Sequence, residues 1–218
     1  MSYRFIFSQV TPYLPLLLKG LKLSFMIASI GMIVGTLVGI FCAIARMSEN
    51  KIVRKTANIY VEIFRNTPLL VQMYLLFFGL AQFNIQVSPI FTAVFALILN
   101  NGAYTGVIFE AGLNDVDKGQ REAAVALGMT TFQTNRYIII PQGFRIVIPP
   151  LTNQFISLFL FSSVASTISV PELLSQTLHL DSITMRTFEV FIIAMLLYLA
   201  ITTVISLLSS YLENSFKY

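Results

Sequence analysis

Long apolar runs without a charge alternate along this chain with short polar segments. Residues 23–45 and residues 66–109 contain no charged side chain, and a run of about 18 apolar residues is enough to cross a bilayer as a helix. The runs are uniformly apolar and lack the period of two that strands of a membrane barrel would have. The pattern therefore predicts an all-α integral membrane protein, one domain over residues 1–218, with about five transmembrane helices near residues 14–45, 58–82, 89–113, 146–168 and 188–212.

One polar segment, residues 118–141, interrupts this apolar pattern. Glu, Ala and Leu between Gln120 and Leu127 favour a short helix, and Gly128 can end it in a left-handed conformation. Thr130 or Thr131 can then cap a second short helix. Two short helices around a sharp glycine turn form a compact knob, which suggests docking into a groove of another protein.

A proline divides the second predicted span. Pro68 lacks a backbone donor and leaves a carbonyl free at a helix kink, while Thr67 and Gln72 supply hydrogen-bonding groups at membrane depth. Such a break can form part of a polar pathway. For Glu62 and Arg65, three residues apart, a second interpretation stays open, namely that they pair with each other at the membrane face.

Glycines and prolines set further expectations for packing and helix ends. Gly31, Gly35 and Gly39 recur every four residues, so they share one helical face and permit close approach of a neighbouring helix. That neighbour can belong to this chain or to a second subunit. We expect Pro149 and Pro150 to prevent regular helix before a fourth span begins near residue 151.

Composition and charge limit the chemistry. The 218 residues are 56% hydrophobic and 11% charged, with a mean hydropathy of +0.78. The net charge of +4 comes from basic residues beside the apolar runs, which fits cytoplasmic loops better than nucleic-acid binding. With one cysteine, Cys42, and one histidine, His179, we expect neither an internal disulfide nor a metal site, and no catalytic residues. The sequence also lacks the G-x-x-x-x-G-K-[ST] loop that binds nucleoside triphosphates.

The polar segment and the proline break both resemble known motifs of ABC importers. Residues 118–141 are similar to the E-A-A loop of their membrane subunits, and Glu62 to Gln72 are similar to the E-x-x-R-x-T-P-L-L-V-Q signature of polar amino-acid permeases. The resemblance implies the ABC type I importer permease fold, in which the E-A-A loop is cytoplasmic and couples to an ATPase. The coupling residues that it implies are Gly119, Gln120, Glu122, Ala123, Ala124, Leu127, Gly128 and Pro141.

The resemblance also implies partners and a location. Two cytoplasmic ATPase subunits would bind ATP and Mg²⁺, so this chain itself would bind no cofactor and would hydrolyse nothing. A periplasmic amino-acid-binding protein would deliver the substrate, and a second permease subunit would complete the pathway in a bacterial inner membrane. Basic loops around residues 46–65 and 118–145 predict an outside N-terminus and a cytoplasmic C-terminus.

The chain departs from the family pattern at positions that contact substrate in relatives. Glu110 stands where the pattern has Arg, and Leu160 and Phe161 stand where it has Lys and Asp. These departures favour a heterodimer whose other permease carries the charged contacts. Glu110 can neutralise a cationic substrate, pair with Arg145 or form another structural ion pair. The substrate-pathway residues that we expect here are Thr67, Pro68, Gln72, Asn101, Tyr104, Glu110, Asn153, Ser162 and Ser163.

The same departures look most like histidine, arginine and lysine uptake systems, while glutamine, cystine and acidic amino acids stay open as substrates. A different class of function, a secondary transporter of small polar solutes driven by an ion gradient, would require internal repeats and intramembrane carboxylates. The sequence has no convincing repeat, and only Glu110 approaches membrane depth.

Overall fold

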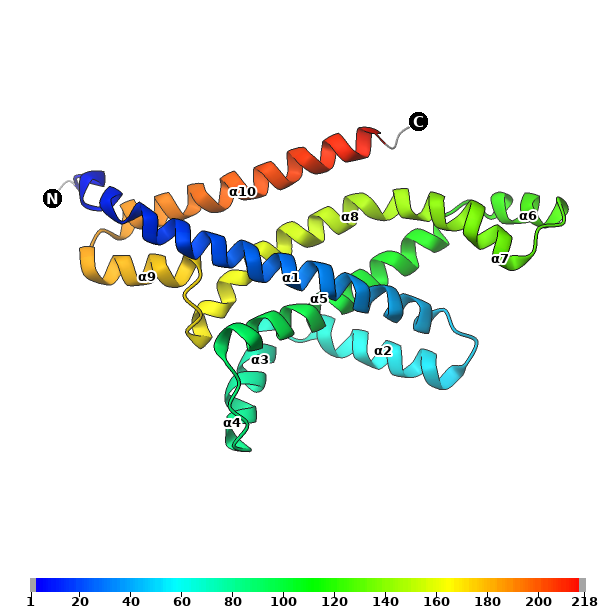
Figure 1. The fold of residues 1–218 in the computed structure, drawn as a ribbon, viewed down its shortest axis with the longest axis horizontal. Helices are drawn as coiled ribbons and strands as arrows, with labels where there is room; N and C mark the ends of the chain where they lie inside the picture. The colour runs from blue at the N-terminus through cyan, green and yellow to red at the C-terminus, as the bar shows by residue number, and fades with distance from the viewer. Residues whose placement is uncertain (1–2, 216–218) are drawn as a thin grey trace.

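The computed structural model describes residues 3–215, which form helices joined by short turns (Figure 1). Four helical segments are long and apolar enough to cross a membrane: Phe7–Arg46, Pro89–Asn114, Thr131–Ile168 and Thr187–Tyr211. A fifth crossing is formed if the bent pair Lys51–Asn66 and Leu69–Gln82 is counted as one span. The predicted all-α membrane class is confirmed.

The centre of the molecule is the pair formed by α1 (Leu14–Arg46) and α5 (Pro89–Asn114). Their backbones approach closely because the glycine face of α1 lies against α5. A Cβ atom added at Gly35 would lie 2.7 Å from Asn101 Nδ2, and one added at Gly31 would lie 3.0 Å from Leu97 Cβ. The neighbour of the glycine face is thus a helix of the same chain. Ile27 and Leu158, the latter from α8, extend this core.

The second predicted span is broken at the proline. Helix α2 (Lys51–Asn66) and the following helical segment, which begins with α3 (Leu69–Tyr74), meet at an angle of 104°. A π-helical turn, Leu75–Gly79, and the short α4, Leu80–Gln82, follow α3. Figure 1 shows α3 and α4 projecting away from the bundle.

The expectation that Pro149 and Pro150 prevent regular helix is wrong. Helix α8 (Ile140–Phe161) continues through both prolines. Each proline lacks only its own N–H, so the carbonyls four residues earlier lose a partner without the chain leaving the helical path. A membrane helix tolerates this loss when its neighbours supply packing. A 3₁₀ segment, Ser162–Ile168, continues from α8 and ends at Ser169, whose φ is 66°.

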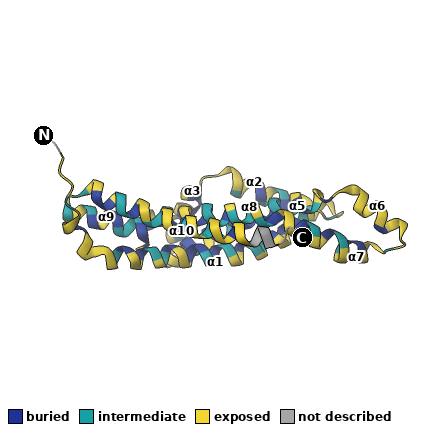
Figure 2. Cartoon of the chain, turned by 90° about the horizontal axis from the view of Figure 1, so that it is seen from above, coloured by how far each residue is buried: buried dark blue, intermediate teal, exposed yellow. Residues whose placement is uncertain are grey.

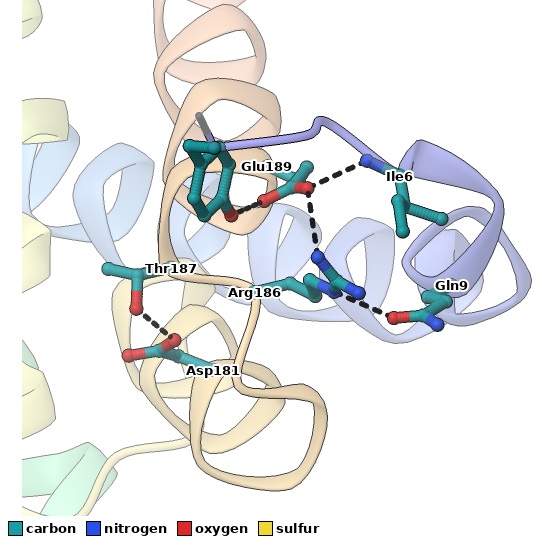
Figure 3. Close-up of polar contacts among 7 residues, drawn as sticks. Ile6, Gln9, Asp181, Arg186, Thr187 and Glu189 are labelled. Carbon is teal, nitrogen blue, oxygen red and sulfur yellow. Dashed lines mark hydrogen bonds and ion pairs between the residues drawn. The ribbon is translucent and has the colours of Figure 1, made fainter. Parts of the chain in front are cut away.

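The chain closes with α9 (Leu173–Thr184) and α10 (Thr187–Ser215). The N-terminal strap, residues 3–9, crosses to the start of α10, as Figure 3 shows. There the backbone N–H of Ile6 donates to Glu189 Oε1 at 2.8 Å, and the Tyr3 hydroxyl donates to the other carboxylate oxygen. Arg186 Nε donates to Gln9 Oε1 at 2.7 Å. These contacts join the first and last spans at one end of the bundle.

Candidate functional site

The coupling loop, residues 118–141, lies at the end of the molecule opposite the N-terminal strap (Figure 1). Its first helix is α6 (Lys118–Ala126), where the Asp117 carboxylate caps the N-terminus by accepting the Gly119 N–H at 2.6 Å. At the other end the Met129 N–H donates to Ala124 O at 3.0 Å and the Gly128 N–H donates to Val125 O at 2.9 Å. This is a Schellman end.

Gly128 ends α6 in the left-handed conformation that the sequence predicts, with a φ of 75°. The second short helix, α7 (Thr131–Thr134), is capped by Thr130, whose Oγ1 accepts the Gln133 N–H at 3.3 Å. The Gln133 side chain accepts the Thr130 N–H at 2.8 Å in return. The reciprocal bonds form a capping box. Both turns are therefore fixed by local hydrogen bonds before any partner is present.

The coupling loop exposes large apolar side chains among its polar ones. Leu127 is 82% exposed and Phe132 is 75% exposed. Figure 2 shows α6 as almost entirely exposed, and of its residues only Ala124 is buried. Large apolar side chains gathered on an exposed knob are typical of a protein-binding surface.

The other predicted coupling residues take defined places on this knob. All five of these residues are exposed: Gly119, Gln120, Glu122, Ala123 and Pro141. Gln142 Nε2 donates to Gln120 Oε1 at 3.2 Å, which ties α6 to the first turn of α8. A π-helical turn, Asn135–Ile139, connects α7 with α8. Such turns are frequent at functional sites.

A network of amide side chains holds the break between α2 and α3. The Gln72 side-chain N–H groups are shared among Phe64 O at 3.0 Å, Thr67 O at 3.1 Å and Thr67 Oγ1 at 2.9 Å. Asn100 Nδ2, from α5, also donates to Phe64 O at 3.0 Å. The carbonyl released by the break is therefore satisfied by two side chains, and Pro68 begins the new helix as its N-cap residue.

A polar groove of about 440 Å³ opens beside this network. The Arg65 guanidinium lies 5.1 Å from the centre of the Tyr104 ring, and in the described residues no ion pair joins it to Glu62. The Asn100 Oδ1 atom is buried and has no hydrogen-bond partner within the described chain. The lining of the polar groove includes Arg65, Thr67, Pro68, Asn100, Tyr104 and Phe161.

Several predicted pathway residues lie outside this groove. Asn101 is fully buried and its Nδ2 donates to Gly31 O and Met32 O, each at 3.3 Å, across the interface between α1 and α5. The hydroxyls of Ser162 and Ser163 donate to carbonyls three residues earlier, at 2.6 and 2.7 Å. Asn153 is exposed on α8. These contacts serve helix packing and the 3₁₀ turn.

Glu110 pairs with a residue that the sequence did not indicate. Arg46 Nε, at the end of α1, lies 2.6 Å from Glu110 Oε2, and the two side chains are 19% and 25% exposed. The pair joins the C-terminal ends of α1 and α5. Glu110 thus forms a structural ion pair, which is one of the roles that the sequence left open.

Sequence reasoning missed a buried carboxylate, Glu172, at the start of α9. Its side chain accepts the Leu174 N–H at 3.0 Å and the Ser175 N–H at 2.8 Å, and it also accepts hydroxyl hydrogens from Ser24 at 3.1 Å and Tyr198 at 3.2 Å. Burial raises the pKa of the Glu172 carboxyl, although these hydrogen bonds oppose that shift. The carboxylate links α1, α9 and α10. Glu is an uncommon N-cap residue, so its position before α9 was only a weak signal of this role.

Comparison with known proteins supplies the context for these features. Residues 35–218 match the family model described as "Binding-protein-dependent transport system inner membrane component". The chain is 36% identical over 207 residues to the probable amino-acid ABC transporter permease protein YckA of Bacillus subtilis, covering 94% of this chain and 90% of that protein. It is 32% identical over 212 residues to the arginine transport system permease protein ArtQ of the same organism, covering 97% of each. Its fold matches the crystal structure of an amino acid ABC transporter with histidines at a TM-score of 0.94 and 37% identity, covering 98% of this chain and 100% of that one.

Proposed function

The chain belongs to the family of binding-protein-dependent transport system inner membrane components, and from this premise we propose that it forms, with a second permease subunit, an ATP-driven import pathway for basic amino acids. It is an amino-acid ABC transporter permease with the type I fold and a multi-pass protein of the inner membrane. The residue roles, the substrate and the partners that follow are our proposal.

The observation that carries the proposal is the coupling loop: two capped helices that expose apolar side chains at one end of the bundle. We assign this surface to a cleft of a cytoplasmic ATPase, which supplies ATP and Mg²⁺. Exposure of Leu127, Val125 and Phe132 in the free chain supports this assignment, because docking would remove their apolar surface from water. Glu122 and Gln120 would form the polar contacts at the rim.

Copurification tests the assignment. Leu127→Asp puts a charge at the centre of the proposed contact and should prevent the cognate ATPase from copurifying in mild detergent. Ile52→Asp, at an equally exposed apolar position on α2, is the matched control and should retain the ATPase. Equal recovery of the ATPase with both variants would contradict docking at the coupling loop.

We assign the substrate pathway to the polar groove beside the α2–α3 break. Arg65 supplies a positive charge at the groove, and Thr67 and Tyr104 add polar side chains to its lining. Thr67, Pro68 and Gln72 hold the break that shapes the groove, and Tyr104 fixes Arg65 by a cation–π contact. Asn100→Leu should remove the hydrogen bonds that Asn100 Nδ2 donates to Phe64 O and Gln72 Oε1 at the break, and uptake by the reconstituted transporter should fall even where the ATPase still copurifies.

The absence of a carboxylate among the residues that line the polar groove supports an asymmetric pair of permeases. Glu110 is engaged by Arg46, so a basic substrate would need its counter-charge from the second subunit. The similarity to an arginine permease and to a transporter structure with histidines supports basic amino acids as the substrate class.

Reconstitution without a second permease tests this division of labour. This chain, its ATPase and its binding protein should together transport basic amino acids poorly, and uptake should return when a related permease with the full charged pattern is added. Robust uptake by a complex in which this chain is the only permease would refute the heterodimer.

We further propose that the N-terminal strap and α9 face the periplasm, where a binding protein delivers substrate, and that the coupling loop and the C-terminus are cytoplasmic. The basic residues that flank the inner end of α1 support this orientation. Single cysteines at Ser2 and Ser215, in a Cys42→Ala background, should differ in labelling by an impermeant reagent. Equal labelling in sealed cells would overturn the orientation.

A further inference from the structure

Beside the coupling loop, and away from the polar groove, a second cavity system runs along the inner ends of the bundle. Its deeper part, which we call the inner slot, has a volume of about 240 Å³ and lies between α1, α5 and α8. Every side chain that lines it is apolar. The walls include Ile40, Ile44, Phe109, Leu113, Phe144 and Val147.

The inner slot continues into a wider, polar mouth of about 440 Å³. Ile44, Leu113 and Ile140 line both cavities, so the two are contiguous. The mouth adds the polar side chains of Arg121 and Asn135. One continuous cavity therefore passes from a wholly apolar interior to a cationic opening at the end of the spans.

Two arginines are available at this mouth. Arg121 of α6 lines it directly, and Arg54 Nη1 donates to the carbonyl of Ser48, another lining residue, at 3.2 Å. Within residues 3–215 neither arginine forms an ion pair, whereas the nearby Arg46 is neutralised by Glu110. The mouth thus carries the positive charge of Arg121 beside the apolar slot.

We propose that the inner slot and its mouth bind an anionic glycerophospholipid of the inner leaflet, with an acyl chain in the slot and the phosphate at Arg121. Arginine pairs with phosphate through two parallel hydrogen bonds, and basic pockets between membrane helices on the cytoplasmic side suit anionic headgroups. A soluble anion would leave the apolar slot unfilled. A helix of another subunit, about 10 Å across, would not fit a slot of this volume.

The position of this lipid site gives it a specific consequence. Ile139 and Asn135, which line the mouth, belong to the π-helical turn that joins the coupling loop to α8. A bound lipid would fill the space between that turn and the end of α1. It would support the coupling loop in the orientation seen here. The site rests on the proposed cytoplasmic orientation of this end but not on the docking of an ATPase.

A tryptophan probe tests the site directly, because the chain contains no tryptophan. Phe144→Trp places the probe in the wall of the slot at a side chain that is 53% exposed, and Phe41→Trp places a control on α1 at a side chain that is 73% exposed and outside the slot. The full chain is inserted into phosphatidylcholine vesicles containing a minority of phosphatidylglycerol. Two vesicle preparations are compared. In one the phosphatidylglycerol carries bromine on its acyl chains, and in the other the phosphatidylcholine does. The brominated lipid quenches the fluorescence of any tryptophan that it contacts.

We expect brominated phosphatidylglycerol to quench the Phe144→Trp probe about fivefold more than its mole fraction in the bilayer predicts. This excess is the preference of the slot for the anionic lipid. The Phe41→Trp probe should follow the bulk composition. Adding Arg121→Gln should abolish the preference, whereas Lys118→Gln, one turn earlier on the same helix and outside the cavity, should not. Soluble glycerol phosphate should not compete.

Four results would overturn the proposal: equal quenching at both probe positions, a preference unchanged by Arg121→Gln, displacement by soluble glycerol phosphate, or a slot probe shielded from both brominated lipids. The last result would mean that protein fills the slot. No transport or hydrolysis is measured in this experiment, so failure of the lipid site and failure of ATPase coupling are recorded separately.

Discussion

Replacement of Gly128 should weaken coupling through backbone conformation alone. Its φ is 75° and a Cβ atom built on it would meet no atom within 4 Å. A non-glycine residue in this left-handed region pays about 1–2 kcal/mol, which corresponds to a 5- to 30-fold lower population of the turn. Asn visits the region more readily than Ala, and a β-branched residue is least suited to it. We therefore expect coupling to decrease in the order Gly, Asn, Ala, Val.

The assay is substrate-stimulated ATP hydrolysis and uptake in a reconstituted complex with the cognate ATPase and binding protein. Gly79→Ala is the matched control, because Gly79 also has open space around it but lies in a helical turn with ordinary φ. The midpoint of thermal unfolding of the membrane bundle should not change in any of these variants. Wild-type activity in the Gly128→Val variant would refute the reasoning. An equal loss of activity in the Gly128→Asn and Gly128→Val variants would refute it as well.

Three further predictions concern packing and charge. Glu172→Ala should lower the stability of the detergent-solubilised chain by about 2–4 kcal/mol, measured by thermal unfolding, because it leaves two backbone N–H groups and two hydroxyls without their acceptor; an unchanged midpoint would contradict this. Gly35→Val should destabilise by about 1–3 kcal/mol because its Cβ would lie 2.7 Å from an Asn101 side-chain atom, and the test is whether α1 and α5 still resist proteolysis. Arg46→Glu and Glu110→Arg should each destabilise by about 1 kcal/mol and the double swap should recover most of the loss; additive losses in the double-mutant cycle would argue against the pair.

Local sequence signals predicted the short helices and turns of residues 118–141. The glycine end and the threonine cap each depend on residues within five positions of one another, so the local sequence contains the whole interaction. The proline break was predictable for the same reason. The glycine face of α1 indicated close packing, but only the structure identified α5 as its neighbour.

Partners far apart in the chain were not predictable in this way. Arg46 and Glu110 are separated by 64 positions, and Ser24 and Glu172 by 148. Several basic residues lie in the segments that flank the C-terminal end of α1, and charge alone does not choose among them. The misjudged Pro149–Pro150 pair has a related cause, because the packing that lets α8 continue comes from other helices rather than from the local sequence.

The N-terminal strap has a consequence for the order in which this protein is completed during synthesis. Tyr3 precedes its acceptor Glu189 by 186 positions, and the ribosome adds about 5–20 residues per second, so roughly 10–40 s pass between them. Throughout that interval the strap has no binding site, and the first helices must be inserted without it. Closure of this end therefore requires that the last helix has arrived, and a nascent chain truncated before residue 189 would leave the aromatic strap without its acceptor.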